Sequence, residues 1–180
     1  MTEKKHIFLN GFMGAGKSKI GPYVAGGLGY TFLDTDKLIE QAAGKTIKDM
    51  FEQEDENYFR NLEQDMLKKL VEENKNAVIA LGGGALVNPV NNMLIKQNGV
   101  TVYLKSSPEA IFQRVKHTSR RPLLEVPRDA HFETNLMLRI KELLAKRTEL
   151  YETADVIIER DGLEPQQVAE LIIKHVNTRL

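Results

Sequence analysis

Short apolar runs alternate along the chain with longer stretches in which apolar residues recur every three or four positions. The short runs predict strands over residues 6–10, 30–33, 77–81, 100–104 and 156–159. The longer stretches predict helices over residues 17–28, 36–43, 46–73, 89–97, 108–116, 128–151 and 165–178. This alternation is typical of a parallel sheet covered by helices on both faces. Such sheets bind ligands at the carboxyl ends of their strands.

Local signals support several of these helix starts and mark two irregular stretches. Thr46 followed by Asp49 resembles a helix-start box, and three prolines suit first-turn positions: Pro89, Pro108 and Pro165. Three glycines follow the run 78–81, and residues 119–127 contain two prolines and no helical period. The arginines in this second stretch suggest a lid over about residues 117–128. No linker or repeat interrupts the pattern, which favours a single domain over residues 1–180.

Composition narrows the class of protein. The chain has 180 residues, of which 42% are hydrophobic and 28% charged, as in a soluble globular protein. Twenty-five basic and 25 acidic residues cancel, so neither nucleic acid nor an anionic membrane is an expected partner. No apolar run approaches the ~20 residues of a membrane span. The absence of cysteine excludes disulfides and thiolate metal sites and fits a cytoplasmic protein.

The strongest motif directly follows the first predicted strand. Residues 11–18 read Gly-Phe-Met-Gly-Ala-Gly-Lys-Ser, which is the P-loop pattern with a helix after it. The backbone N–H groups of Gly14, Ala15 and Gly16 and the positive end of the helix can hold phosphate oxygens. Lys17 can reach the β- and γ-phosphates, and the Ser18 hydroxyl can ligate Mg²⁺. The motif predicts binding of a nucleoside triphosphate, namely ATP.

Two carboxylates follow the second predicted strand, in the sequence Asp34-Thr35-Asp36. One can act in the Mg²⁺ shell, and the other can accept a hydrogen bond and a proton from a substrate hydroxyl. The alternative for Asp36 is a helix N-cap ahead of Lys37. Capping does not exclude substrate binding.

Two helical arginines are candidate ligands for an anion. Arg60 stands beside Phe59 in a helical pattern and could equally be a solvated side chain. Arg147 falls three and four residues beyond Leu144 and Leu143, on the apolar stripe of its helix. A cation there must extend to solvent, pair with an acid or face a pocket.

The two irregular stretches are also candidate sites. Gly82, Gly83 and Gly84 let a ligand approach the backbone, although they could simply form a strand exit. Arg120 and Arg121 in the predicted lid could clamp phosphate oxygens or lie in solvent.

Taken together, these motifs closely resemble the shikimate kinase family along nearly the whole chain. The segments that carry the resemblance are the P-loop, Leu33-Asp34-Thr35-Asp36, Phe59-Arg60, Leu81-Gly82-Gly83-Gly84-Ala85, Arg121-Pro122-Leu123-Leu124, and Lys146-Arg147 before Tyr151. The resemblance implies a P-loop kinase fold, a three-layer α/β/α sandwich with a five-stranded parallel sheet in the order 2-3-1-4-5. It implies a monomer that uses Mg²⁺ and transfers the ATP γ-phosphoryl group to the 3-hydroxyl of shikimate, on the route to chorismate and the aromatic amino acids.

The resemblance also implies roles for individual residues. Lys17 and Arg121 would contact ATP, Arg114 would lie against the adenine, and Ser18 and Asp34 would hold the metal. In a shikimate-binding segment of about residues 34–62, Asp36 would hold the shikimate hydroxyls. Arg60 and Arg147 would grip the carboxylate, with Gly82, Gly83 and Gly84 forming the turn beneath the substrate. Lys17, Asp36 and Arg121 would be the catalytic residues.

One residue departs from the family pattern, and two other functions compete. Lys19 stands where the family usually has a threonine or another small residue, which bears on the α-phosphate contact. A kinase for another polyol, such as gluconate, would share the scaffold, but the triple glycine together with Arg60 and Arg147 argues against it. A non-catalytic nucleotide-dependent switch would not need the paired aspartates.

Overall fold

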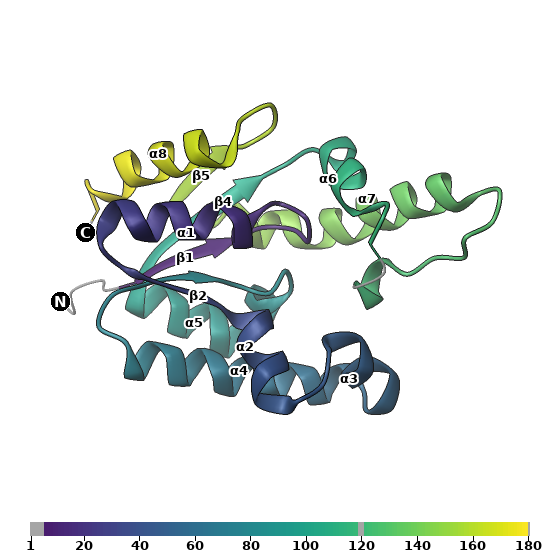
Figure 1. Ribbon diagram of the computed structural model, residues 1–180, viewed down its shortest axis with the longest axis horizontal. Helices are drawn as coiled ribbons and strands as arrows, with labels where there is room; N and C mark the ends of the chain where they lie inside the picture. The colour runs from purple at the N-terminus through teal and green to yellow at the C-terminus, as the bar shows by residue number, and fades with distance from the viewer. Residues whose placement is uncertain (1–5, 119–120, 180) are drawn as a thin grey trace.

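The computed structural model describes residues 6–118 and 121–179 (Figure 1). Its centre is a five-stranded parallel sheet with the strand order β2-β3-β1-β4-β5, which confirms the expected order. The strands are β1 (His6–Asn10), β2 (Thr31–Asp34), β3 (Ala77–Ala80), β4 (Gly99–Lys105) and β5 (Val156–Glu159).

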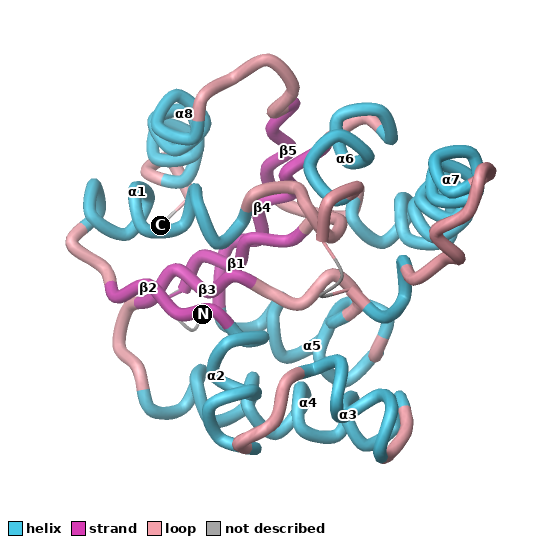
Figure 2. Tube along the Cα trace, turned by 45° about the vertical axis from the view of Figure 1, so that its right-hand side comes forward, coloured by secondary structure: helices cyan, strands magenta, loops and turns pink. Residues whose placement is uncertain are grey.

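Helices cover both faces of this sheet, which confirms the three-layer α/β/α sandwich (Figure 2). One face carries α1 (Lys17–Leu28) and α8 (Pro165–Val176). The other carries α4 (Glu56–Glu73), α5 (Pro89–Asn98), α6 (Pro108–Val115) and α7 (Phe132–Tyr151). The short helices α2 (Thr35–Ala43) and α3 (Ile47–Gln53) pack beside α4.

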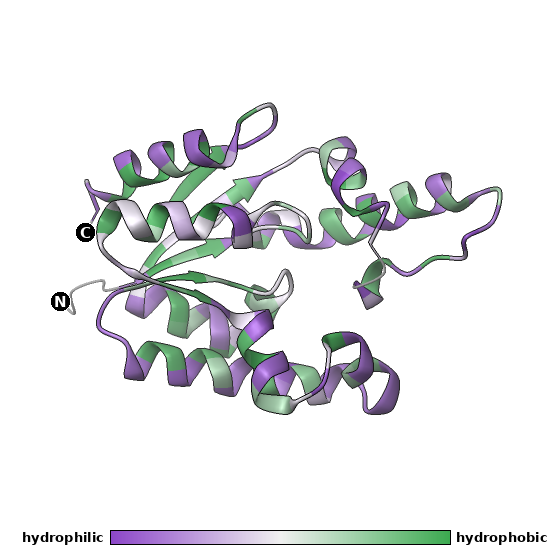
Figure 3. Cartoon of the chain, viewed as in Figure 1, coloured by the Kyte–Doolittle hydropathy of each residue, from purple (hydrophilic) through white to green (hydrophobic). Residues whose placement is uncertain are grey.

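The alternation of side chains along β1 shows how one strand serves two cores. Ile7 and Leu9 point into the cluster formed with α1 and α8, whereas Phe8 points into the cluster formed with α4 to α7. All three are fully buried, and burying each such side chain stabilises the fold by roughly 1.5–3 kcal/mol. The hydropathy colouring shows the same arrangement, with apolar strands between helices whose outer faces are polar (Figure 3). The central strands are therefore held rigidly where the site begins.

The structure corrects the predicted helix over residues 46–73, which is two helices. Thr46 caps α3 through the expected box with Asp49, and α3 ends at Gln53. Asp55 then caps α4 by accepting a hydrogen bond from the Tyr58 backbone N–H at 2.7 Å. An aspartate favours a new N-terminus over a helix interior, so the helical period alone did not reveal the break.

Most other bounds agree with the prediction to within one or two residues, and two helix starts differ in an informative way. Helix α7 begins at Phe132 rather than at residue 128. The Asp129 side chain accepts a hydrogen bond from the His131 backbone N–H in a turn that precedes the helix. The N-cap of α2 is Asp34, not Asp36, so the capping alternative for Asp36 is wrong. The irregular stretches contain short 3-10 helices, η1 (Ala85–Val87) and η2 (Pro122–Leu124).

Two glycines of α1 should respond oppositely to alanine. A Cβ atom on Gly21 would lie 2.0 Å from the Phe32 ring, whereas one on Gly26 would meet no atom within 4 Å. We expect Gly21→Ala to lower the free energy of unfolding by about 1–3 kcal/mol through overpacking. The matched control Gly26→Ala should raise it by up to about 1 kcal/mol, because alanine favours a helix over glycine. Urea denaturation measures both, and equal effects would contradict this packing.

Candidate active site

Three segments that carry candidate functional residues meet at the carboxyl edge of the sheet. Parallel pairing places Leu9 of β1 and Asp34 of β2 level with Ala80 of β3. The P-loop leaves β1, the aspartate pair leaves β2 and the triple-glycine turn leaves β3 at this common level. The sheet register therefore brings together motifs that lie far apart in the sequence.

The P-loop is curled by glycines in the left-handed region. Gly14 has φ 83° and Gly16 has φ 98°, which other residues rarely adopt. Lys17 folds back, and its Nζ donates hydrogen bonds to the carbonyls of Gly11 at 2.6 Å and Phe12 at 3.2 Å. Burial lowers the pKa of Lys17 to about 8, with the nearby Arg121 guanidinium acting in the same direction. Within the described residues Lys17 forms no ion pair, so its charge suits a phosphate.

Ser18 and Asp34, the two residues expected to hold a metal, are hydrogen-bonded to each other. The Ser18 Oγ donates to Asp34 Oδ2 at 2.5 Å, and the other Asp34 oxygen accepts from the Lys37 backbone N–H at 3.3 Å. Among the described residues, no three His, Cys, Asp or Glu side chains group as metal ligands. A hydroxyl and one carboxylate fit Mg²⁺, which keeps waters and takes phosphate oxygens rather than a full protein cage.

A cavity of about 520 Å³ lies beside the P-loop. It is lined by most of the predicted nucleotide-binding residues, namely Gly14, Gly16, Lys17, Ser18, Lys19, Arg114 and Arg121. Ala15 instead lies buried in the core beneath the loop. Arg114 donates to the Gly14 carbonyl and to Ser106 Oγ, both at 3.3 Å, and pairs with Asp161 at 3.5 Å.

Arg160 also lines this cavity and escaped the sequence reasoning. Its side chain is buried, and one nitrogen donates to the Leu163 carbonyl at 3.3 Å, while its Nε has no partner in the part of the chain that the structure describes. Burial lowers its pKa, with Arg114 contributing. It directly follows β5, and no periodicity or motif marks it.

A second cavity lies on the other side of the triple-glycine turn. Six predicted substrate-binding residues line it: Asp36, Arg60, Gly82, Gly83, Gly84 and Arg147. Its apolar wall comes from Ile47, Phe51, Phe59 and Leu123. The structure therefore brings together the residues that sequence reasoning assigned to one small polar substrate.

Glu63 is a further acid in this cavity that the sequence reasoning missed. It is 1% exposed, and one oxygen accepts from Arg60 at 2.8 Å. Its other oxygen and Asp36 Oδ1 have no hydrogen-bond partner among the described residues, and both face the position where Gly82 lacks a side chain. Burial raises the pKa of both carboxyls, while the cations Arg60 and Arg121, respectively, lower them. Two unpaired carboxylate oxygens offer acceptors for substrate hydroxyls.

A signal for Glu63 was present in the sequence. It stands four residues after Phe59 and four before Leu67, and all three are buried on one face of α4. This placement on an apolar stripe is the same signal that marked Arg147.

Arg147 is a buried cation. It is 7% exposed and donates to the Gly83 carbonyl at 3.1 Å. No carboxylate of the described residues lies within ion-pair distance of it, whereas Arg60 pairs with both Glu56 and Glu63. A buried charge without a counter-ion is costly, so this position favours an anionic ligand.

The two cavities share one wall, formed by Met13, Asp36, Gly83 and Arg121. Across it, Arg121 Nη1 lies 3.4 Å from Asp36 Oδ2. Asp36 is held in place by its neighbour Thr35, whose Oγ1 donates to the Ala80 carbonyl at 3.1 Å and accepts from the Gly82 N–H at 3.0 Å. A group bound in one cavity can therefore reach a group bound in the other at Asp36.

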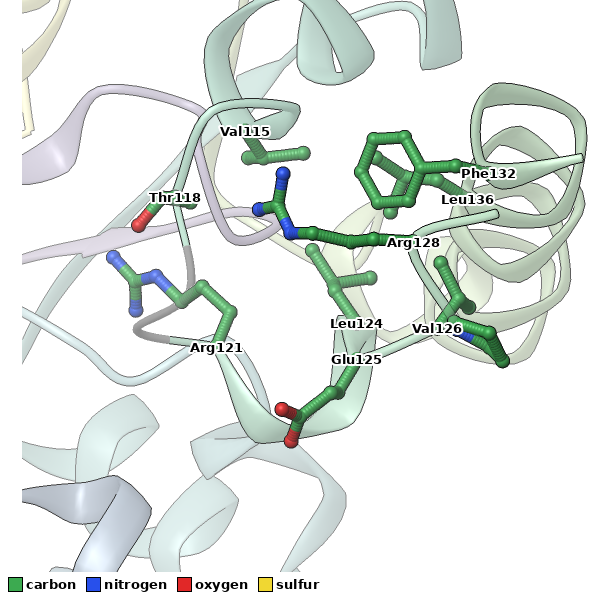
Figure 4. A pocket seen from close by; sticks show the side chains of 10 residues that line it. Val115, Thr118, Arg121, Leu124, Glu125, Val126, Arg128, Phe132 and Leu136 are labelled. Atoms are coloured by element: carbon green, nitrogen blue, oxygen red, sulfur yellow. The ribbon is translucent and has the colours of Figure 1, made fainter. Parts of the chain in front are cut away.

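The predicted lid segment contacts the substrate side as well as the nucleotide side. Glu125, just after η2, pairs with Lys48 of α3 at 3.2 Å. A third cavity, of about 490 Å³, lies between α6, η2 and α7, with Arg121 at its edge and Arg128 4.8 Å from the Phe132 ring centroid (Figure 4). Arg120, the other lid arginine considered above, lies outside the described residues, as does Ser119.

The model of one protein family, described as shikimate kinase, matches residues 13–177. The chain belongs to the shikimate kinase family. The shikimate kinase of Thermodesulfovibrio yellowstonii is 45% identical over 94% of both chains, and that of Chlorobium limicola is 42% identical over 98% of this chain and 90% of its own. The solved shikimate kinase from Acinetobacter baumannii, in complex with shikimate, superposes with a TM-score of 0.89 at 36% identity, over 97% and 94% of the two chains.

Membership of the shikimate kinase family makes the chain an ATP-dependent phosphotransferase and decides against the non-catalytic switch. The P-loop kinase fold expected from the sequence is confirmed by the same neighbours. None of the helices in the described residues has both the length and the apolar character needed to cross a membrane.

The low pKa of Lys17 should make nucleotide affinity depend on pH. Below a pH of about 8 the ammonium carries its charge, and as the pH rises through that value it loses the charge. We therefore expect ADP affinity to fall between about pH 7 and 9, the range around that pKa. Calorimetric titration of ADP across this range measures it.

Lys17→Arg is the matched control for this titration. A guanidinium stays protonated throughout, so its ADP affinity should stay level with pH, whatever its absolute value. The same fall in both proteins would assign the pH dependence to another group.

Proposed function

We propose that this chain transfers the γ-phosphoryl group of ATP to the 3-hydroxyl of shikimate, giving shikimate 3-phosphate and ADP. The observation that carries the proposal is the shared wall between a P-loop cavity and a cavity with two arginines and two carboxylates. Shikimate is a small ring with one carboxylate and three hydroxyls. Its carboxylate suits paired arginines, and its hydroxyls suit carboxylate acceptors.

On the nucleotide side, the P-loop backbone and Lys17 would hold the phosphates, and Arg114 would lie against the adenine. Ser18 would ligate Mg²⁺ directly and Asp34 through water. The metal would neutralise charge on the phosphate oxygens. Lys19 is exposed at the first turn of α1 and lines this cavity, so we assign it an electrostatic contact in place of a hydroxyl.

On the acceptor side, Arg60 and Arg147 would grip the carboxylate above the triple-glycine turn. Asp36 and Glu63 would accept hydrogen bonds from the ring hydroxyls. This arrangement disfavours gluconate, whose open chain offers no ring to pack against the apolar wall that includes Phe59 and Leu123. It orients the 3-hydroxyl toward the shared wall.

The transfer itself would occur across that wall. The 3-hydroxyl oxygen bonds to the γ-phosphorus, the bond from this phosphorus to the β-γ bridging oxygen breaks, and ADP leaves with the electron pair. The hydroxyl proton passes toward Asp36, whose raised pKa suits an acceptor. Because phosphoryl transfer is largely dissociative, holding the hydroxyl in line contributes more than base strength. Lys17 and Arg121 would stabilise the charge on the transferred group.

A coupled ADP-release assay tests the proposed function. We expect Mg²⁺-dependent turnover with shikimate, and at least about 100-fold lower kcat/KM with gluconate or a nucleoside monophosphate, as for a site whose polar groups are left unpaired. Equal rates with gluconate would favour a gluconate kinase. ATP hydrolysis at the same rate with and without every acceptor would exclude both kinase activities. Omitting Mg²⁺ tests the metal requirement.

Arg60 and Arg147 should contribute differently to the thermal stability of the ligand-free protein. Replacing either by methionine should raise the KM for shikimate by roughly 30-fold or more, since losing one partner of a buried charge pair costs at least about 2 kcal/mol. Arg147→Met should leave the melting temperature of the ligand-free protein unchanged or higher, because it removes an uncompensated charge. Arg60→Met should lower it, because Glu63 loses its counter-ion.

Thermal unfolding without ligand, beside steady-state kinetics, separates the two variants. A lower melting temperature for Arg147→Met than for Arg60→Met would contradict the view that Arg147 is an uncompensated charge whereas Arg60 is the counter-ion of Glu63. Size-exclusion chromatography checks the predicted monomer, and the cytoplasmic location stays a prediction from composition.

A further inference from the structure

Three consecutive glycines carry no conformational preference of their own, so the turn between the two cavities depends on outside contacts. The Leu81 N–H donates to the Leu9 carbonyl and the Gly82 N–H to Thr35 Oγ1, both at 3.0 Å. The Gly83 carbonyl is held from the other side by α7. It accepts from both Arg147 and the hydroxyl of Tyr151.

Tyr151 is placed for this contact by the helix period. It lies four residues after Arg147 on α7, so both side chains leave the same face of the helix. It is 2% exposed and does not line either cavity of the site. Its ring packs against that of Tyr103 in a tilted arrangement, with centroids 5.1 Å apart. Tyr103 thus holds the ring, and the hydroxyl end reaches the turn.

One peptide unit links this hydroxyl to both substrate arginines. The Gly83 carbonyl and the Gly84 N–H belong to the same planar trans unit and point in opposite directions. Arg147 contacts the carbonyl, while a Cβ atom on Gly84 would lie only 2.6 Å from Arg60 Nη2. The orientation of this peptide plane therefore sets the position of the turn between the guanidinium groups of Arg60 and Arg147.

We propose that Tyr151 is a positioning residue for shikimate, whose hydroxyl locks the Gly83 carbonyl so that Arg147 presents its remaining N–H groups to the carboxylate. A guanidinium has five N–H donors, and Arg147 donates one of them to the Gly83 carbonyl. Burial raises the pKa of Tyr151 to about 12, so the hydroxyl keeps its proton throughout the assay range. This inference rests on the proposed function.

The direct test is Tyr151→Phe, with Tyr103→Phe as the matched control. Both changes remove one hydroxyl from a buried tyrosine of the same ring pair, but only Tyr151 bonds to the turn. We expect Tyr151→Phe to raise the KM for shikimate about fivefold, the factor that corresponds to ~1 kcal/mol. Its kcat and its KM for ATP should stay within about twofold, as should all constants of Tyr103→Phe.

A carboxylate-free analogue separates positioning from a general structural role. The shikimate analogue with a hydroxymethyl group in place of the carboxylate cannot use Arg147. The preference of the enzyme for shikimate over this analogue should fall about fivefold in Tyr151→Phe and stay unchanged in Tyr103→Phe. In an Arg147→Ala background, Tyr151→Phe should alter the KM for shikimate by less than about twofold, because the hydroxyl acts through that arginine.

Several results would overturn the inference. An unchanged shikimate preference in Tyr151→Phe, or equal losses in both phenylalanine variants, would show that the hydroxyl serves packing alone. Failure of Tyr151→Phe to fold, with Tyr103→Phe folded, would show that the hydroxyl serves the fold first. Lack of shikimate turnover by the unaltered protein would instead reject the proposed function.

Discussion

Parallel pairing of β1, β2 and β3 is the constraint on which the rest of this molecule depends. It places the ends of three strands at one level, so that Leu9, Asp34 and Ala80 are neighbours across the sheet. The P-loop, the aspartate pair and the glycine turn begin where these strands stop. Because the strands are buried on both faces by helices, their ends cannot shift independently. The packing of the sheet therefore determines the relative positions of the three motifs that form the site.

Electrostatic imbalance is the second organising feature. Within the described residues, the cations Lys17 and Arg147 form no ion pair and donate to backbone carbonyls. One carboxylate oxygen of Asp36 and one of Glu63 have no hydrogen-bond partner in the same part of the chain. Each is costly to bury alone. Anionic phosphates and a hydroxylated carboxylate would offset both imbalances at once. The empty site is thus less stable than it could be, and that deficit favours ligand binding.

The sequence predicted much of this arrangement because its signals are local. The P-loop has a fixed spacing, and the strand runs end where the motifs start, so the roles near Lys17 and Asp36 could be proposed from the chain alone. Arg147 could be proposed because a cation on an apolar helix stripe is out of place. Glu63 carried the same signal and was overlooked among the many charged residues of α4.

What could not be predicted depends on contacts between distant segments. The break at Glu54 follows from a side-chain cap that competes with helical period, and such competition is decided by packing. Arg160 enters the nucleotide cavity only because β5 lies beside β4. The Tyr151 hydroxyl reaches Gly83 across 68 residues of sequence.

The contact between Arg121 and Asp36 makes the two halves of the site thermodynamically dependent on each other. In the protein as described, this arginine rests on the carboxylate that an acceptor hydroxyl would use. A triphosphate that drew Arg121 away would free the second oxygen of that carboxylate, Oδ2, so the first ligand would lower the free-energy cost of binding the second. Linkage requires the converse in equal measure: the acceptor strengthens nucleotide binding by the same factor. The salt bridge from Lys48 to Glu125 spans the same two segments but is solvent-exposed, and such pairs contribute little to stability. The enzyme would therefore sense the presence of one substrate through its affinity for the other, without a separate regulatory site.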